Sequence, residues 1–66
     1  MKATINGRIR ELPEELTVGA LLEFLGSPRR GVAVARNERV VRRDEYERDR
    51  VCDGDRIEII EAVAGG

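Results

Sequence analysis

A single short amphipathic segment is the feature that most constrains the fold of this 66-residue chain. Between residues 18 and 25, apolar side chains recur at i, i+3, i+4 and i+7, which is the spacing of one face of a helix of about two turns. They are Val18, Leu21, Leu22 and Leu25. Thr17 is a candidate N-cap, and Gly26 followed by Pro28 ends the helix. The rest of the chain has strand-like patterns, so the apolar face of this helix has to pack on a sheet.

The other apolar segments show the alternation or β-branching that is typical of strands. We expect strands at residues 2–6, 8–12, 32–35, 39–41 and 56–62. The expected turns between them are Asn6-Gly7, Asn37-Glu38 and Asp53-Gly54-Asp55. Residues 44–50 have no clear period, and we expect a loop with one helical turn held by Tyr46. The last strand holds three isoleucines without glycine or proline, which predicts the most buried strand.

The predicted order is strand, strand, helix, strand, short strand, strand. A right-handed crossover by the helix would place the last strand parallel to the first, in the middle of the sheet. This is the α+β arrangement called the β-grasp, or ubiquitin-like, fold: a mixed sheet of four to five strands with one helix packed on one face. We expect residues 1–62 to form that domain and residues 63–66 to form a flexible C-terminal tail.

Charge and composition exclude several classes of partner. The 12 basic and 13 acidic residues are interleaved, so the chain lacks the basic field that would collect nucleic acid. The stretch from Arg36 to Arg50 contains six arginines but also five acidic residues, which indicates a solvated, salt-bridged face or, as the alternative, a contact surface for a protein partner. No apolar run approaches the ~20 residues that cross a bilayer. With one cysteine and no signal peptide in view, we expect a cytoplasmic protein without a membrane partner.

The residues of an enzyme are missing from the sequence. It has no histidine, so it lacks a ready general base and the usual nucleophile and metal sites, and its glycines form neither a phosphate loop nor a dinucleotide fingerprint. Asp53-Gly54-Asp55 reads better as a turn than as a calcium loop. Cys52 has no neighbouring cation in sequence, and we expect it to be a small buried apolar residue. The chain is therefore predicted not to be an enzyme and to hold neither a cofactor nor a metal.

The C-terminal Ala64-Gly65-Gly66 sequence offers a different chemistry. On its own a Gly-Gly end is a weak signal and could be a frayed terminus. Here it follows the strand predicted to be central, and residues 62–66 extended would reach about 16 Å at ~3.3 Å per residue. Glycine lacks a Cβ, so such a tail can thread a narrow channel. A carboxylate has to be activated before it reacts, which this chain cannot do, so the tail is predicted to be the substrate of another enzyme.

The chain resembles the ThiS family of small sulfur carriers nearly from end to end. The matching segments are Asn6-Gly7, Thr17-Val18, Leu21-Leu22, residues 32–37, Val40-Val41, residues 53–59 and Val63-Ala64-Gly65-Gly66. Arg42 is a departure, because many members have proline there. The resemblance implies that the Gly66 carboxylate is adenylated by a ubiquitin-activating-like (ThiF-like) adenylyltransferase that consumes ATP, and receives sulfur from a cysteine-derived donor. A ThiG-like thiazole synthase would then take the sulfur from the thiocarboxylate for the thiazole of thiamine.

Further residues are expected to bind the partners, and other functions stay open. The predicted partner-binding residues are Gly65, Ala64, Val63, Ala62 and Ile60. For Ile60, core packing is the equal alternative, and Ile60→Asp would separate the two. The rival functions are the small subunit of molybdopterin synthase, a carrier that thiolates tRNA or modifies proteins, and a non-covalent ubiquitin-like binding module. Only the last of these would survive deletion of Gly65-Gly66.

Overall fold

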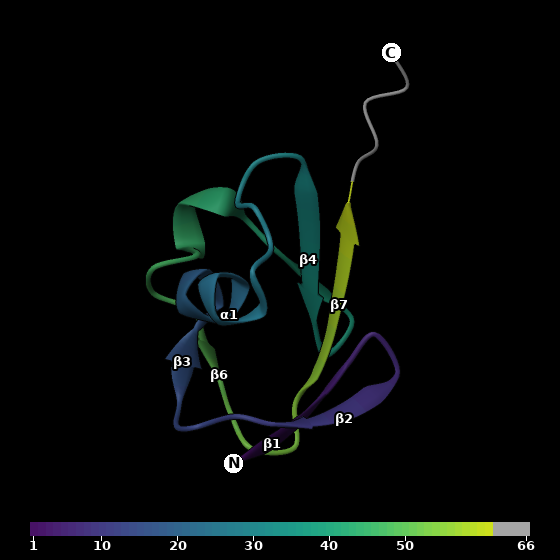
Figure 1. Ribbon diagram of the computed structural model, residues 1–66. Coiled ribbons are helices and arrows are strands. Elements are labelled where there is room, and N and C mark those ends of the chain that lie inside the picture. Colours follow the sequence, from purple (N-terminus) through teal and green to yellow (C-terminus); the bar gives the residue numbers. More distant parts are fainter. Residues whose placement is uncertain (62–66) are drawn as a thin grey trace.

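The computed structural model describes residues 1–61 and has two sheets and one α-helix (Figure 1). Its elements are β1 (Lys2–Ile5), β2 (Arg8–Glu11), β3 (Leu16–Thr17), α1 (Val18–Leu25), β4 (Val32–Arg36), β5 (Arg39–Val41), the 3₁₀ helix η1 (Arg43–Glu45), β6 (Arg50–Val51) and β7 (Arg56–Glu61). The larger sheet has the order β2-β1-β7-β4-β5. Strand β7 runs parallel to β1 and antiparallel to β4. The predicted β-grasp arrangement, with the last strand central and parallel to the first, is confirmed.

Helix α1 begins and ends where the sequence predicts. The Thr17 hydroxyl accepts a hydrogen bond from the Ala20 backbone N–H at 3.1 Å, and Gly26 closes the helix in the left-handed conformation with φ of 72°. The predicted apolar stripe faces the sheet, with Leu25 at its partly buried end. Its inner members Val18, Leu21 and Leu22 are fully buried. The helix therefore covers one face of the sheet, as Figure 1 shows.

The core lies between α1 and the covered face of the sheet. It consists of Ala3, Ile5, Leu12, Val18, Leu21, Leu22, Val34, Val41, Tyr46, Val51 and Ile57. Tyr46 follows η1 and is 3% exposed, so the predicted helical turn and its buried anchor are confirmed. The second sheet, β3 with β6, was missed by the sequence reasoning. Each of its strands has two residues, which is too short for a period of two to show.

The expectation that β7 is the most buried strand is wrong. It is central in the sheet, but only Ile57 is fully buried, Ile59 is half-buried and Ile60 is 65% exposed. The helix covers a single face of the sheet, so alternate side chains of even a central strand point to solvent. A run of isoleucines therefore indicates a strand, but it does not show whether one or both faces of that strand are covered.

The two tight hairpin turns use the left-handed backbone region. Asn6 and Gly7 have φ of 51° and 82°, which is the type I′ geometry predicted for this pair. Asn37 and Glu38 form the second turn with φ of 52° and 69°. Glutamate rarely adopts such a φ, so the second turn carries backbone strain.

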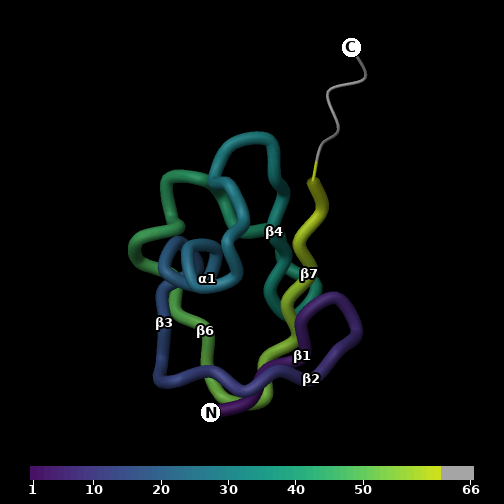
Figure 2. The backbone as a smooth tube through the Cα atoms, in the orientation of Figure 1, coloured from purple at the N-terminus to yellow at the C-terminus, as the bar shows by residue number. Residues whose placement is uncertain are grey.

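Strand β7 extends past β1 toward the end of the molecule that lies opposite Met1 (Figure 2). The expected boundary between residues 62 and 63 lies outside the described residues. Within residues 1–61, no helix is long and apolar enough to cross a membrane.

Candidate functional site at the end of strand β7

The last residues of β7 are held on both sides. On one side β4 pairs with β7 up to Val32 opposite Glu61. On the other side, backbone pairing with β1 reaches only as far as Ile57, and the Asn6 side chain continues it. The Asn6 amide oxygen accepts from the Ile59 N–H at 2.8 Å, and its amide nitrogen donates to the Ile59 carbonyl at 3.2 Å. The strand that leads to the C-terminus is thus fixed almost to its end.

The sequence predicts only a turn role for Asn6, and this second role is not predicted from it. The side-chain amide carries one donor and one acceptor, so it can replace a missing strand neighbour at a single residue. No local pattern reveals this, because the partner, Ile59, lies 53 positions away in the chain.

The predicted site residues divide into one that the structure describes and five that it does not. Gly66, Gly65, Ala64, Val63 and Ala62 lie outside the described residues, so their roles stay predictions. Ile60 is described, and its exposure shows that it is not a core residue. Of the two alternatives for Ile60, core packing is therefore wrong, and partner binding stays a prediction.

Ile60 belongs to an apolar area on the uncovered face of the sheet. In the strand register Ile60 lies opposite Ala33, and Ala35 lies opposite Val40, on the face away from α1. Val40 is 71% exposed. We call these four residues (Ala33, Ala35, Val40 and Ile60) the open-face patch. The patch spans β7, β4 and β5. Its Ile60–Ala33 pair lies near the end of β7, and the exposed Glu58, opposite Ala35, shares this face.

Asp55 is the buried polar centre at the other end of β7. Its carboxylate accepts three hydrogen bonds: from the Arg36 guanidinium at 3.0 Å, the Asn37 amide at 3.0 Å and the Cys52 backbone N–H at 2.7 Å. Asn37 in turn accepts from the Arg56 N–H at 2.9 Å. The network joins the β4–β5 turn to the start of β7. Asp55 is 8% exposed. The Asp53-Gly54-Asp55 segment therefore forms the predicted turn and also contributes a buried, hydrogen-bonded carboxylate.

The electrostatics of this network favour the charged forms. Burial by itself would raise the pKa of Asp55, but the hydrogen bonds from Cys52, Asn37 and Arg36 and the positive charge of Arg36 lower it below its usual value. Burial likewise opposes the charge of Arg36, yet Asp49 and Asp55 raise its pKa. Asp55 is therefore ionised at neutral pH.

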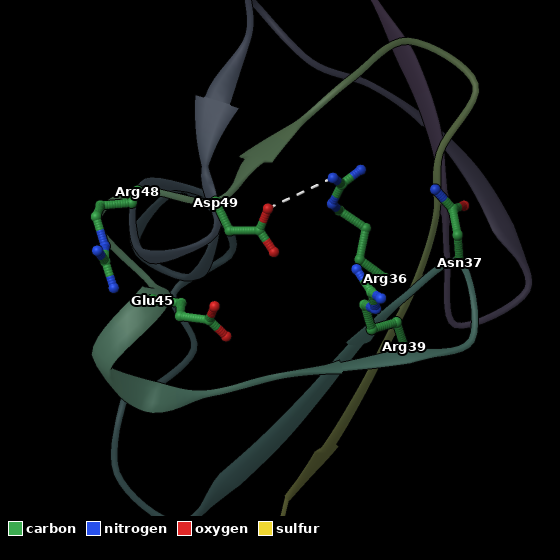
Figure 3. A pocket seen from close by; sticks show the side chains of 6 residues that line it. All are labelled: Arg36, Asn37, Arg39, Glu45, Arg48 and Asp49. Carbon is green, nitrogen blue, oxygen red and sulfur yellow. Dashed lines mark hydrogen bonds and ion pairs between the residues drawn. The ribbon is translucent and has the colours of Figure 1, made fainter.

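The arginine-rich stretch forms ion pairs, as the interleaved charges predict. Arg36 pairs with Asp49 at 3.4 Å as well as with Asp55, and Arg42 pairs with Asp44 at 3.4 Å. Part of this face is concave. An open pocket of about 390 Å³ is lined by Arg36, Asn37, Arg39, Glu45, Arg48 and Asp49 (Figure 3).

Arg42, the departure from the family pattern, leaves the loop geometry intact. Its φ of −74° is within the range of proline, and its N–H donates to the Glu45 carboxylate at 3.1 Å, which caps η1. An arginine here keeps the backbone path that a proline would take and adds one hydrogen bond.

The expectation that Cys52 is a buried apolar residue is wrong. The residue is exposed in the turn that precedes β7. Its backbone N–H points inward to Asp55, so its side chain is left outside. Within residues 1–61, no group of three or more histidine, cysteine, aspartate or glutamate residues is placed to hold a metal ion.

The chain is similar to known proteins over its whole length. The model of the ThiS family matches residues 3–66, which includes the Gly-Gly end. The chain belongs to the ThiS family. It is 33% identical to the sulfur carrier protein ThiS of Escherichia coli, and the alignment covers all of both chains. The family prediction and the expectation of a carrier that is not an enzyme are confirmed.

Solved structures and one longer relative agree with this assignment to ThiS. The crystal structure of ThiS from Geobacter metallireducens matches with a TM-score of 0.87 and 32% identity over all of both chains. Its solution structure matches with a TM-score of 0.84, and this chain covers 88% of it. A thiazole synthase of Paramagnetospirillum magneticum is 44% identical over all 66 residues, but the chain spans only 20% of the length of that protein.

Proposed function

We propose that this ThiS-family chain carries sulfur for thiazole formation in thiamine biosynthesis, as a thiocarboxylate on Gly66. The family match through residue 66 is the observation that carries the proposal. The carriers matched over their whole length are named for sulfur carriage and for thiamine biosynthesis. The longer relative supports a ThiG-like partner, because a thiazole synthase contains a segment similar to this entire chain.

The chemistry of the tail is activation followed by substitution. The Gly66 carboxylate attacks the α-phosphate of ATP on a ThiF-like enzyme, which forms the acyl adenylate and releases pyrophosphate. A sulfide equivalent derived from cysteine then replaces AMP, leaving the thiocarboxylate. Thiazole synthase takes up the sulfur, and the carrier returns to the plain carboxylate. The chain itself binds no cofactor in this scheme, since ATP is consumed by the partner, and the cycle runs in the cytoplasm.

Partner contact is proposed along the tail and the sheet face beside it. Ala62, Val63, Ala64 and Gly65 would lie in the partner's channel. The open-face patch, with Ile60 nearest to the tail, would rest on the partner's surface, because exposed apolar side chains that are grouped beside a reacting end gain most from burial. The Asn6 and β4 contacts to the end of β7 support this role by giving the tail a fixed base.

The decisive experiment measures the intact mass of the chain after incubation with ATP, a cysteine-derived sulfur donor and the activating enzyme of the same organism. The proposal expects a product that is heavier by the difference between sulfur and oxygen, located at Gly66. The control is the same chain without Gly65-Gly66, which should fold as before and stay unmodified. An unchanged mass with every activating enzyme of the organism would refute the proposal.

The same deletion separates a carrier from a non-covalent binding module. A module that acts only through its sheet would keep its function without the two glycines. The pathway is tested by nutrient rescue of a deletion strain: thiamine should restore growth, and a requirement for molybdenum cofactor instead would move the chain to the molybdopterin branch.

A further inference from the structure

The pocket at the far end of the sheet from the tail has walls of opposite charge. One wall is the end of the β4–β5 hairpin, with Arg36, Asn37 and Arg39, and the other is the segment after β5, with Glu45, Arg48 and Asp49. Figure 3 shows the Arg36 and Arg39 side chains on one side and the carboxylates of Glu45 and Asp49 on the other. The site is therefore a charged concavity rather than a flat solvated face.

Only some of the charged side chains in the two walls form ion pairs with other residues of the chain. Arg36 is fixed by Asp49 and by Asp55 beneath it. The Glu45 carboxylate accepts one hydrogen bond, from the backbone N–H of Arg42, which carries no charge. Arg39 has no ion pair or side-chain hydrogen bond within residues 1–61, although it lines the same pocket as Glu45. Arg48 has none either, so two guanidinium groups and the Glu45 carboxylate in the pocket lining have no ion-pair partner within residues 1–61.

From this arrangement we infer that the pocket is a docking site for a mixed-charge segment of the enzyme that activates the tail. An acidic side chain of that enzyme pairs with Arg39, and a basic side chain pairs with Glu45. The inference rests on the proposed function and adds to it a second contact, distant from Gly66, that identifies the carrier.

The balance of charge argues for a protein segment and against a free anion. The six lining residues carry three positive and two negative charges, and Asp55 beneath them cancels the remainder. A site with no net charge does not concentrate phosphate, and a phosphate group near Arg39 would also face two carboxylates. Matched charges held in fixed positions instead give specificity and orientation between proteins.

The place of the pocket explains why the activating enzyme would use it. Strand β4 pairs with the end of β7 at Val32 and reaches the pocket at Arg36, four residues or about 13 Å further along the sheet. The two places lie on different faces of the sheet, because Arg36 has the orientation of the buried Val34 and Ile60 the opposite one, so an interface that includes both has to wrap around the edge strand β5. A Gly-Gly end is a generic feature, so an enzyme that reads only the tail cannot select its carrier. A remote contact in fixed geometry supplies that selection at the first committed step.

The test is the steady-state rate of adenylation by the activating enzyme, followed as pyrophosphate release at several carrier concentrations. The variants are Arg39→Gln, Glu45→Gln and their combination. Glutamine at position 45 keeps the oxygen that caps η1 and removes the charge. Arg8→Gln is the matched control for Arg39→Gln, because Arg8 is exposed on the opposite edge strand β2 and its replacement changes the net charge by the same amount and sign.

We expect each pocket variant to raise KM by about two- to fivefold, the effect of one exposed ion pair. The value of kcat should stay unchanged because the tail is intact, and Arg8→Gln should leave KM at the wild-type value. Added salt should raise KM of the wild type more than that of the double variant. Pocket variants that fold normally and keep the wild-type KM, or match Arg8→Gln, would overturn the inference. A wild-type chain that is not adenylated at all would refute the proposed function as well.

Discussion

Replacing Asp55 with alanine should remove a large share of the stability of the fold. The substitution leaves three buried or partly buried donors without their acceptor: the Arg36 guanidinium, the Asn37 amide and the Cys52 N–H. A hydrogen bond to a charged group contributes about 1.5–3 kcal/mol, but the three are not additive. The Arg36 side chain is 28% exposed and keeps Asp49, so part of the loss is recovered. We expect a net cost of about 2–4 kcal/mol.

That cost is large for a chain of this length. At about 0.05–0.15 kcal/mol per residue, the whole domain has a stability of roughly 3–10 kcal/mol. Urea unfolding followed by far-ultraviolet circular dichroism should show a midpoint lower by about 2–4 M, with m near 1 kcal/mol per M. Tyr46, the only tyrosine in a chain without tryptophan, gives an independent fluorescence signal of the same transition.

Asp44→Ala is the matched control for burial. Asp44 also pairs with an arginine, at 3.4 Å, but its side chain is 66% exposed and that of its partner Arg42 is 76% exposed. Exposed pairs of this kind contribute about 0–1 kcal/mol, so the midpoint should barely move. Equal midpoints for Asp55→Ala and Asp44→Ala would refute the reasoning, because they would show that the Asp55 network adds no more than a surface ion pair.

Four further predictions follow from particular contacts. Folding lowers the pKa of Asp55 below its usual 3.8, so its contribution to the free energy of unfolding is complete above about pH 5 and is lost as the pH falls through the native pKa. The difference in stability between wild type and Asp55→Asn should therefore close when urea unfolding is repeated at acid pH. Leu21→Ala, at a fully buried position, should cost about 2–5 kcal/mol in urea unfolding, and Ile59→Ala, at a half-buried one, clearly less. Glu38→Gly should raise the free energy of unfolding by up to about 1 kcal/mol, because glycine adopts the φ of 69° without strain, and the midpoint of thermal unfolding should rise with it. Ile60→Asp should leave the unfolding curve near that of the wild type and weaken adenylation, whereas an unfolded Ile60→Asp chain would contradict the assignment of Ile60 to the surface.

The fold could be predicted because its signals are local and agree with one another. The helix of residues 18–25 has a period, a cap and a stop signal within ten residues, and each is realised in the structure. The Asn6-Gly7 turn requires positive φ at both positions, and few dipeptides allow that. One helix, two hairpins and a final strand then leave few chiral ways to close the sheet, so the topology followed from the order of the elements.

The parts that escaped prediction depend on contacts that are distant in the chain. The Asn6 amide meets Ile59, and Asp55 meets Arg36, only after the sheet has formed. The exposure of Ile60 depends on which face of the sheet the helix covers, and that of Cys52 depends on which way its turn points. The neighbouring residues in the sequence determine neither. Residue type alone predicts a buried Cys52, because a small apolar side chain is usually buried, but its position in the turn leaves it exposed.

The two ends of β7 have separable roles, and the separation can be argued from the contacts. At its start, Asp55 and Asn37 join three segments of the chain, so replacing them should lower the stability of the whole fold. At its end, Asn6 and the partner strand β4 hold Ile59 and Glu61, and beyond them the sequence has no large apolar side chain except Val63. Residues 1–61 already contain a buried core that joins helix and sheet, so we expect substitutions in the Gly-Gly end to change reaction with a partner without changing the free energy of unfolding. A carrier needs this division, since its reacting group has to enter another protein's active site while the domain behind it stays folded.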